Sequence, residues 1–126
     1  MTNYNTTTME EKLYNLEQIE LMSGGNSLFV EKMVNLFIEL TPELMNRIKT
    51  GLIESDYLEI KSAAHKMKPS IDMMGIGKLK NEIRNIEKLA LEHADVMTLN
   101  NAINYLDSIL NQVMLQLKNR DKEGLN

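Results

Sequence analysis

The fold is decided by residues 99–117, LNNAINYLDSILNQVMLQL, near the carboxyl end of the chain. Apolar side chains recur in this stretch at every third or fourth position: Leu99, Ile103, Leu106, Leu110, Val113 and Leu117. Because an α-helix has about 3.6 residues per turn, this spacing places all of them on one face. The stretch therefore predicts a long amphipathic helix that buries one face against other elements.

Three earlier stretches repeat the pattern. Residues 29–52 carry the stripe Phe29, Met33, Leu36, Leu40, Leu44, Ile48 and Leu52. This stripe keeps its register across Pro42, which removes a helical hydrogen bond, so we predict one kinked helix there. The other two stripes are Tyr57, Ile60, Ala64, Met67, Ile71 and Met74, and then Leu79, Ile83, Ile86 and Ala90.

The ends of these helices are marked by capping residues and glycines. Asn26, Asp56 and Asp95 each precede a stripe and can accept a hydrogen bond from a free helical N–H, and Glu59 gives Asp56 the spacing of a capping box. A shorter helix ends at Gly24-Gly25. No stretch alternates like a strand, so we predict an all-α fold, an antiparallel up-and-down four-helix bundle with a short extra N-terminal helix. The bundle should span residues 11–118, with residues 1–10 and 119–126 as disordered polar tails.

Composition excludes several classes of function. The formal net charge of −4 argues against a nucleic-acid-binding protein, which needs a basic face. No apolar run reaches the length of a membrane span, and no secretion signal is visible, so we expect a cytoplasmic protein. The N-terminal methionine and the short tails favour a free-standing carrier over a piece of a hybrid kinase, but both alternatives stay open. The chain has no cysteine, and its two histidines lack the spacing of a metal motif, so we expect no metal site.

His65 stands apart from the stripes, in the stretch SAAHKMKPS at residues 62–70. The core stripe passes through Ala64 and Met67, so the helical phase predicts that His65 is exposed. Lys61 and Lys68 lie one turn away on the same side and can attract an anion. The spacing alone leaves open a plain solvated face with a passive histidine. The other histidine, His93, continues the apolar phase of Ile86 and Ala90 at the C-terminal end of its helix, where an imidazolium favours the helix dipole, so a structural role is the better interpretation.

The run Ala64-His65-Lys66-Met67-Lys68, followed by Gly75 and Leu79, resembles the signature of histidine phosphotransfer (HPt) domains. The flanking segments are similar to that family as well, and the resemblance covers about residues 15–117. These segments are Leu21 to Asn26 with Phe29 and Val30, Leu36-Phe37 through Thr41-Pro42-Glu43-Leu44, Ser55-Asp56-Tyr57, and Ile86-Glu87.

The resemblance implies a phosphorelay carrier on a four-helix bundle. His65 would accept a phosphoryl group from an aspartyl phosphate on a response-regulator receiver domain and pass it to another receiver. Lys68 would steady the phosphate charge, and Glu87 would orient the other ring nitrogen of His65. Lys61 is a supporting candidate that rests on helical spacing rather than on the motif. A solvated imidazole is largely neutral above pH 7 and can act as a nucleophile.

The resemblance also implies the partners and the cofactors. The partners would be receiver domains and a hybrid sensor histidine kinase, with this chain a monomer without autonomous kinase activity. The chain would bind no cofactor, because the receiver would supply the magnesium ion. A receiver would need a docking surface around His65, for which Pro69, Met73 and Leu58 form an apolar rim. For Met73 and Leu58, partial burial in the bundle is the better interpretation.

Pro69 departs from the family pattern, because many members carry a small residue after the lysine. Proline has no N–H to donate to the carbonyl of His65, so we expect the helix to bend beside the histidine. Two alternative functions differ from a relay. A non-catalytic helical interaction module would keep its function after His65→Gln. An independent enzyme is disfavoured, because Gly75-Ile76-Gly77-Lys78 lacks the spacing of a phosphate-binding loop.

Overall fold

A computed structural model describes residues 11–124, and the side chains of residues 11–120, of this chain. The described part is all-helical and contains no strand. Its helices are α2 (Glu17–Ser23), α3 (Ser27–Ile53), α4 (Tyr57–Met73), α5 (Gly77–Leu91) and α6 (Val96–Gly124). None of these helices is both long enough and apolar enough to cross a membrane.

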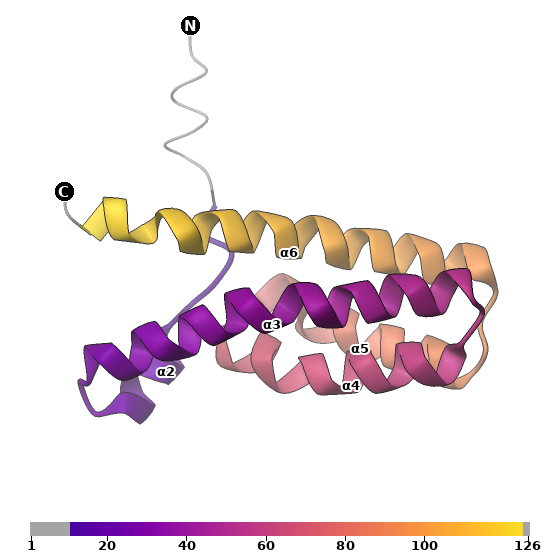
Figure 1. Ribbon diagram of the computed structural model, residues 1–126, viewed down its shortest axis with the longest axis horizontal. Coiled ribbons are helices and arrows are strands. Elements are labelled where there is room, and N and C mark those ends of the chain that lie inside the picture. The colour runs from indigo at the N-terminus through magenta and orange to yellow at the C-terminus, as the bar shows by residue number, and fades with distance from the viewer. Residues whose placement is uncertain (1–10, 125–126) are drawn as a thin grey trace, which may run out of the picture.

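The four long helices form an antiparallel bundle (Figure 1). α3 packs on α4, α4 on α5, α5 on α6, and α6 returns to α3, so the contacts close around one apolar core. Connections of a few residues between consecutive helices allow only antiparallel neighbours. The short α2 packs against α3 and, with Ile19, covers one end of the core. The predicted bundle with its extra N-terminal helix is therefore confirmed.

The stripes predicted for the last three helices face the core. Every stripe residue of α5 and α6 is buried, as are those of α4 and its end except Tyr57, which is half-buried and packs on the core from the side. Burial of this many aliphatic side chains is the main source of stability in a bundle of this size.

The stripe predicted for α3 is wrong by part of a turn. The residues of α3 that are buried are Val34, Phe37, Thr41, Met45, Ile48 and Gly51, whereas Leu36 and Leu40 of the predicted stripe are exposed. The reason is that α3 carries two adjacent apolar faces and packs on both α4 and α6. The second face, on the α4 side, remains partly open. The helix itself runs without interruption through Pro42, as predicted.

The predicted caps are present, with one change. Asn26 accepts hydrogen bonds from the N–H groups of Leu28 and Phe29, and Asp95 accepts one from Thr98. Asp56 accepts one from the N–H of Glu59 at 3.1 Å. The reciprocal half of that capping box is missing, because the carboxylate of Glu59 binds Arg47 of α3 instead.

The turn between α4 and α5 shows why Gly75 is a glycine. Its φ is +62°, a left-handed conformation in which other residues are strained, and a Cβ there would lie 2.5 Å from the carbonyl oxygen of Asn15. The N–H of Asn15 in turn donates to the carbonyl of Met74 at 2.9 Å. The segment before α2 is thereby held against this turn.

The C-terminal tail predicted from residue 119 is wrong in part, because α6 continues to Gly124. Arg120 explains the extension: its guanidinium pairs with Glu31 of α3 at 2.5 Å, which attaches the last turns of α6 to the bundle. Gln116 adds contacts to the segment before α2, since its side chain bonds the N–H of Leu13 and the carbonyl of Glu11. The tail predicted at residues 1–10 lies outside the described residues.

Candidate functional site

His65 lies in the middle of α4 with 66% of its side chain exposed. Its neighbours Ala63, Ala64 and Met67 are fully buried, so the helix turns its apolar face to the core and leaves the histidine beside it. The exposure predicted from the helical phase is therefore confirmed. The small side chains of the alanines also keep α4 close to its neighbours.

Glu87 of α5 reaches the histidine across the seam between the two helices. One carboxylate oxygen, Oε2, lies 2.7 Å from Nδ1 of His65, and the other, Oε1, lies 2.7 Å from Nζ of Lys68. Lys68 is one turn beyond His65 on α4 and is only 24% exposed, while Glu87 is 18% exposed. A single half-buried carboxylate thus holds both the exposed ring and the lysine.

The negative charge of Glu87 determines which nitrogen of the His65 ring carries the proton. The Lys68 ammonium, together with the His65 ring, holds the pKa of the Glu87 carboxyl below its ordinary value, although partial burial acts in the opposite direction. An ionised carboxylate can only accept hydrogen bonds, so Nδ1 of His65 donates. In the neutral ring the proton is then on Nδ1, and Nε2 carries a free lone pair.

Two further ion pairs fix α4 on both sides of the histidine. Before it, Arg47 of α3 binds Glu59 at 2.6 Å, and after it, Arg84 of α5 binds Asp72 at 2.6 Å. Each arginine uses two of its nitrogens, which defines the relative position of the helices better than a single contact does. The arginines hold the pKa of Glu59 and of Asp72 below the ordinary carboxyl value.

Lys61 and Pro69 take no part in the Glu87 network. Lys61 is half-buried one turn before His65, and within the described part of the chain it forms no ion pair. Pro69 is exposed one turn after His65, and α4 continues past it to Met73. A helical residue at position 69 would ordinarily donate to the carbonyl of His65, and Pro69 has no N–H to do so. The predicted bend at this position stays a prediction.

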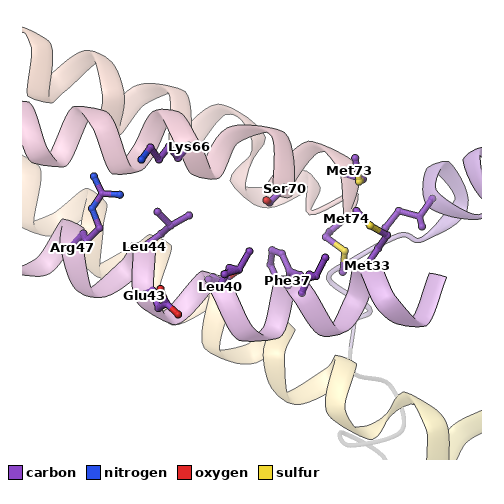
Figure 2. A pocket seen from close by; sticks show the side chains of 13 residues that line it. Met33, Phe37, Leu40, Glu43, Leu44, Arg47, Lys66, Ser70, Met73 and Met74 are labelled. Carbon is purple, nitrogen blue, oxygen red and sulfur yellow. The ribbon is translucent and has the colours of Figure 1, made fainter. Parts of the chain in front are cut away.

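A groove of about 430 Å³ runs between α3 and α4, beside the histidine face (Figure 2). Its floor is apolar and includes Phe37, Leu40, Leu44, Met33, Met73 and Met74, and Lys66, Ser70, Glu43 and Arg47 contribute polar groups. Lys66 is the residue next to His65. The groove was not predicted, because Leu36, Leu40 and Leu44 were expected in the core. The signal that could have revealed it is a second apolar row on α3, Val34, Phe37 and Met45, which lies beside the predicted stripe and fills the core in its place.

The apolar rim predicted around His65 is present in part. Leu58, two turns before the histidine on α4, is 74% exposed, so the expectation of partial burial is wrong for this residue. Its position at the first turn of α4 points it away from the core. Met73 is half-buried and packs on the core, as expected, and it also lines the groove.

His93 belongs to a different environment. It follows α5 with a φ of +53°, and its ring stacks on that of Tyr57 with 4.4 Å between the ring centroids. Its N–H donates to the carbonyl of Ala90 and thereby helps to close the helix end. Among the side chains of residues 11–120 no group of three potential ligands could hold a metal ion.

Comparison with known proteins agrees with this geometry. The family model for the Hpt domain matches residues 32–116. Among solved structures, the HPt domain of an Hpt sensor hybrid histidine kinase from Shewanella is similar in fold, with a TM-score of 0.74 and 20% sequence identity. The match covers 89% of this chain and 96% of that domain. No curated protein sequence matched.

The family match extends over most of the chain and includes α4, α5 and the residues His65, Lys68 and Glu87. Members of this family are phosphotransfer carriers in phosphorelays, not autonomous kinases, and they interact with receiver domains and histidine kinases. A bundle with an exposed histidine in the middle of one helix is what such a carrier requires. The chain belongs to the Hpt domain family.

Proposed function

We propose that His65 is the phosphoacceptor of this chain, taking a phosphoryl group from an aspartyl phosphate of one receiver domain and passing it to another. The observation that carries the proposal is the network in which Glu87 holds both Nδ1 of His65 and Nζ of Lys68 on an exposed helix face. It combines a nucleophile, a group that fixes its orientation, and a cation within one turn.

The transfer step follows from the tautomer of His65, in which Nδ1 carries the proton and Nε2 has a free lone pair. The lone pair on Nε2 attacks the phosphorus, a new N–P bond forms, and the P–O bond to the aspartyl carboxylate breaks with its electron pair leaving on that oxygen. The proton stays on Nδ1, so positive charge develops on the ring as the bond forms. Glu87 stabilises that charge through the hydrogen bond at Nδ1, as a carboxylate does for an imidazolium.

Lys68 acts on the other charge in the reaction. Its ammonium is held one turn from His65 by Glu87, and it can turn toward a phosphoryl group on Nε2 without leaving the site. Phosphoryl transfer depends mainly on in-line positioning and on neutralising the oxygens of the phosphoryl group. The receiver would supply the acidic pocket and the magnesium ion, and this chain would bind no cofactor. Lys61 is a second, weaker source of positive charge on the same face.

The surface around His65 suits a receiver domain. Leu58 and Pro69 lie before and after the histidine on its exposed side, and the groove between α3 and α4 starts beside Lys66. This surface combines apolar contact area with Lys61 and Lys66, which form no ion pair within the described residues. Local cations favour an acidic receiver pocket in spite of the net negative charge of the chain.

The test is phosphotransfer from a ³²P-labelled receiver domain to the wild-type chain and to His65→Gln. We expect the wild type to take up label that is lost in acid and kept in alkali, as a phosphoramidate is, and His65→Gln to take up none. Helicity and melting temperature should be unchanged in the variant, because the side chain is exposed. Label on His65→Gln would contradict the proposal, and so would acid-stable label on the wild type.

The competing interpretation is a helical interaction module in which His65 is passive. It predicts that His65→Gln binds receiver domains and supports signalling as the wild type does. Measuring receiver binding and label transfer on the same variant separates the two functions, because only a relay needs the transfer.

A further inference from the structure

Besides Leu58, which lies on the side of His65, four large apolar side chains are exposed at the end of the bundle where α3 joins α4 and α5 joins α6. They are Ile53, Leu91, Val96 and Met97, with exposures of 83%, 64%, 52% and 74%. We call them the end patch. Figure 1 shows that the two connections lie at the same end of the molecule. Apolar groups gathered on one surface and surrounded by polar residues are typical of interaction sites.

The two connections are ordered and joined to each other. The ring of Tyr57, at the start of α4, stacks on His93 between α5 and α6. Ser55 and His93 both adopt left-handed conformations that close their helices, with return hydrogen bonds from Asp56 to Gly51 and from Ala94 to Leu89. The end patch is therefore presented by a preformed surface, which lowers the entropic cost of binding.

The two connections carry charge of one sign, although the last turn of α5 adds the exposed Lys88 beside them. Residues 53–58 and 91–97 contain the carboxylates Glu54, Asp56, Glu92 and Asp95 and neither lysine nor arginine. The charges of these four carboxylates sum to the formal net charge of −4 of the whole chain, so the charges of all other residues sum to zero. Glu54 and Glu92 are exposed and form no ion pair within residues 11–120.

We propose that the end patch is a binding site for a polypeptide segment of another protein that presents apolar side chains between lysines or arginines. Charge complementarity selects this partner. A second copy of the chain would bring the same four carboxylates against these, and nucleic acids and anionic membranes would be repelled for the same reason. The proposal does not rest on the phosphotransfer function.

The end patch is separate from the histidine. Tyr57 and His65 are eight residues apart on α4, about 12 Å along the helix. A segment bound across the two connections therefore leaves the ring of His65 accessible. Such a partner could locate the chain within a larger assembly while a receiver domain binds at His65.

The experiment is a ¹⁵N NMR titration of the full chain with a synthetic 14-residue amphipathic peptide of leucine and lysine, with a leucine and glutamate peptide of the same pattern as control. We expect shift changes at residues 53–57 and 91–97 with the lysine peptide only, and weaker binding at 500 mM than at 50 mM salt. The double variant Ile53→Gln, Met97→Gln should bind about tenfold more weakly. Leu115→Gln, which changes a leucine of α6 that is 63% exposed and lies outside the end patch, should bind as the wild type does.

Three results would overturn the proposal. These are no binding of the lysine peptide, binding that maps to the groove between α3 and α4, and equal binding of the glutamate peptide. Sedimentation of the chain alone adds a fourth: a dimer that the double variant abolishes would assign the end patch to self-association. The variants change exposed residues, so their unchanged melting temperatures check that the fold is intact.

Discussion

The two histidines, one in the middle of α4 and one in the connection between α5 and α6, are both exposed, yet their surroundings differ. His65 is in the middle of a helix, with Nδ1 bound to a carboxylate and a lysine one turn away. His93 follows a helix end, in a left-handed conformation, with its ring against Tyr57. The first ring is oriented by charge and keeps a free nitrogen on an open face. The ring of His93 is held by stacking on Tyr57, and its backbone closes the end of α5.

Exposure by itself therefore does not separate the two histidines. The role proposed for His65 also needs a charged partner that fixes the tautomer and a cation near the place where new negative charge would develop. Glu87 supplies the first of these to His65, and Lys68 the second. Within the described residues His93 has neither, although it follows directly after α5 and its ring contacts Tyr57 of α4.

The same substitution at the two sites should give the largest difference. We expect His65→Gln to lose label transfer from a phosphorylated receiver completely, because no nucleophile remains at that position. His93→Gln should transfer within about twofold of the wild-type rate, since only a surface stack is lost. Single-turnover transfer assays on both variants measure this. Equal loss of transfer in both variants would mean that the two histidines do not differ in function and that the integrity of the fold limits transfer.

The matched pair Glu87→Gln and Glu92→Gln tests whether the charge at Nδ1 matters. Removing the carboxylate charge costs the ring a charge-assisted hydrogen bond, so we expect transfer through Glu87→Gln to slow about 10- to 100-fold. Glu92→Gln, beside His93, should leave the rate unchanged.

A structural role for Glu87 would lower receiver affinity or stability without this effect on the rate constant. Receiver binding should therefore be measured on the same samples, by calorimetry. A normal rate constant in Glu87→Gln would show that orientation of the ring does not depend on the carboxylate charge.

The dependence of the unfolding free energy on pH should also differ between the site of His65 and Glu87 and the surroundings of His93. The pKa of Glu87 is lower in the folded chain, chiefly through Lys68, so the unfolded state takes up protons first as the pH falls. The stabilisation is fully present above the ordinary carboxyl pKa, about 4.3, and is lost as the pH falls through the lower folded value. We expect Glu87→Gln to be about 1 kcal/mol less stable than the wild type at pH 7, with the gap closing in acid.

Urea unfolding of both proteins at several pH values between 7 and 3 measures that gap. His93→Gln is the control, because its difference from the wild type should not follow the titration of Glu87. A gap for Glu87→Gln that stays constant down to pH 3 would contradict the assignment.

The sequence predicted the bundle well because α4, α5 and α6 each have only one apolar face. Leu79, Ile83 and Ile86, for example, leave no choice of which side is buried. For α3 there were two apolar faces, and helical spacing cannot tell which of them meets the core and which remains open as a groove. That choice depends on how α3 packs between α4 and α6.

The candidate site was predictable to a similar degree. The phase of Ala64 and Met67 gave the exposure of His65, and the family resemblance indicated Glu87. The sharing of one carboxylate between His65 and Lys68 was not predictable, because it depends on the register between α4 and α5. The continuation of α6 was missed for the same reason, since Arg120 finds Glu31 only in the folded chain.

The smallest expected effect concerns the backbone of His93. At a φ of +53°, a residue with a Cβ is strained, and glycine relieves about 1 kcal/mol of that strain. His93→Gly and His93→Ala both lose the stack on Tyr57, worth about 0.5–1.5 kcal/mol, but only the glycine variant gains the relief. We therefore expect His93→Gly to be about 1 kcal/mol more stable than His93→Ala in urea unfolding, with transfer through His65 unchanged in both. Equal stability of the two would mean that the connection does not need its left-handed residue, and the structural role assigned to His93 would then reduce to the stack alone.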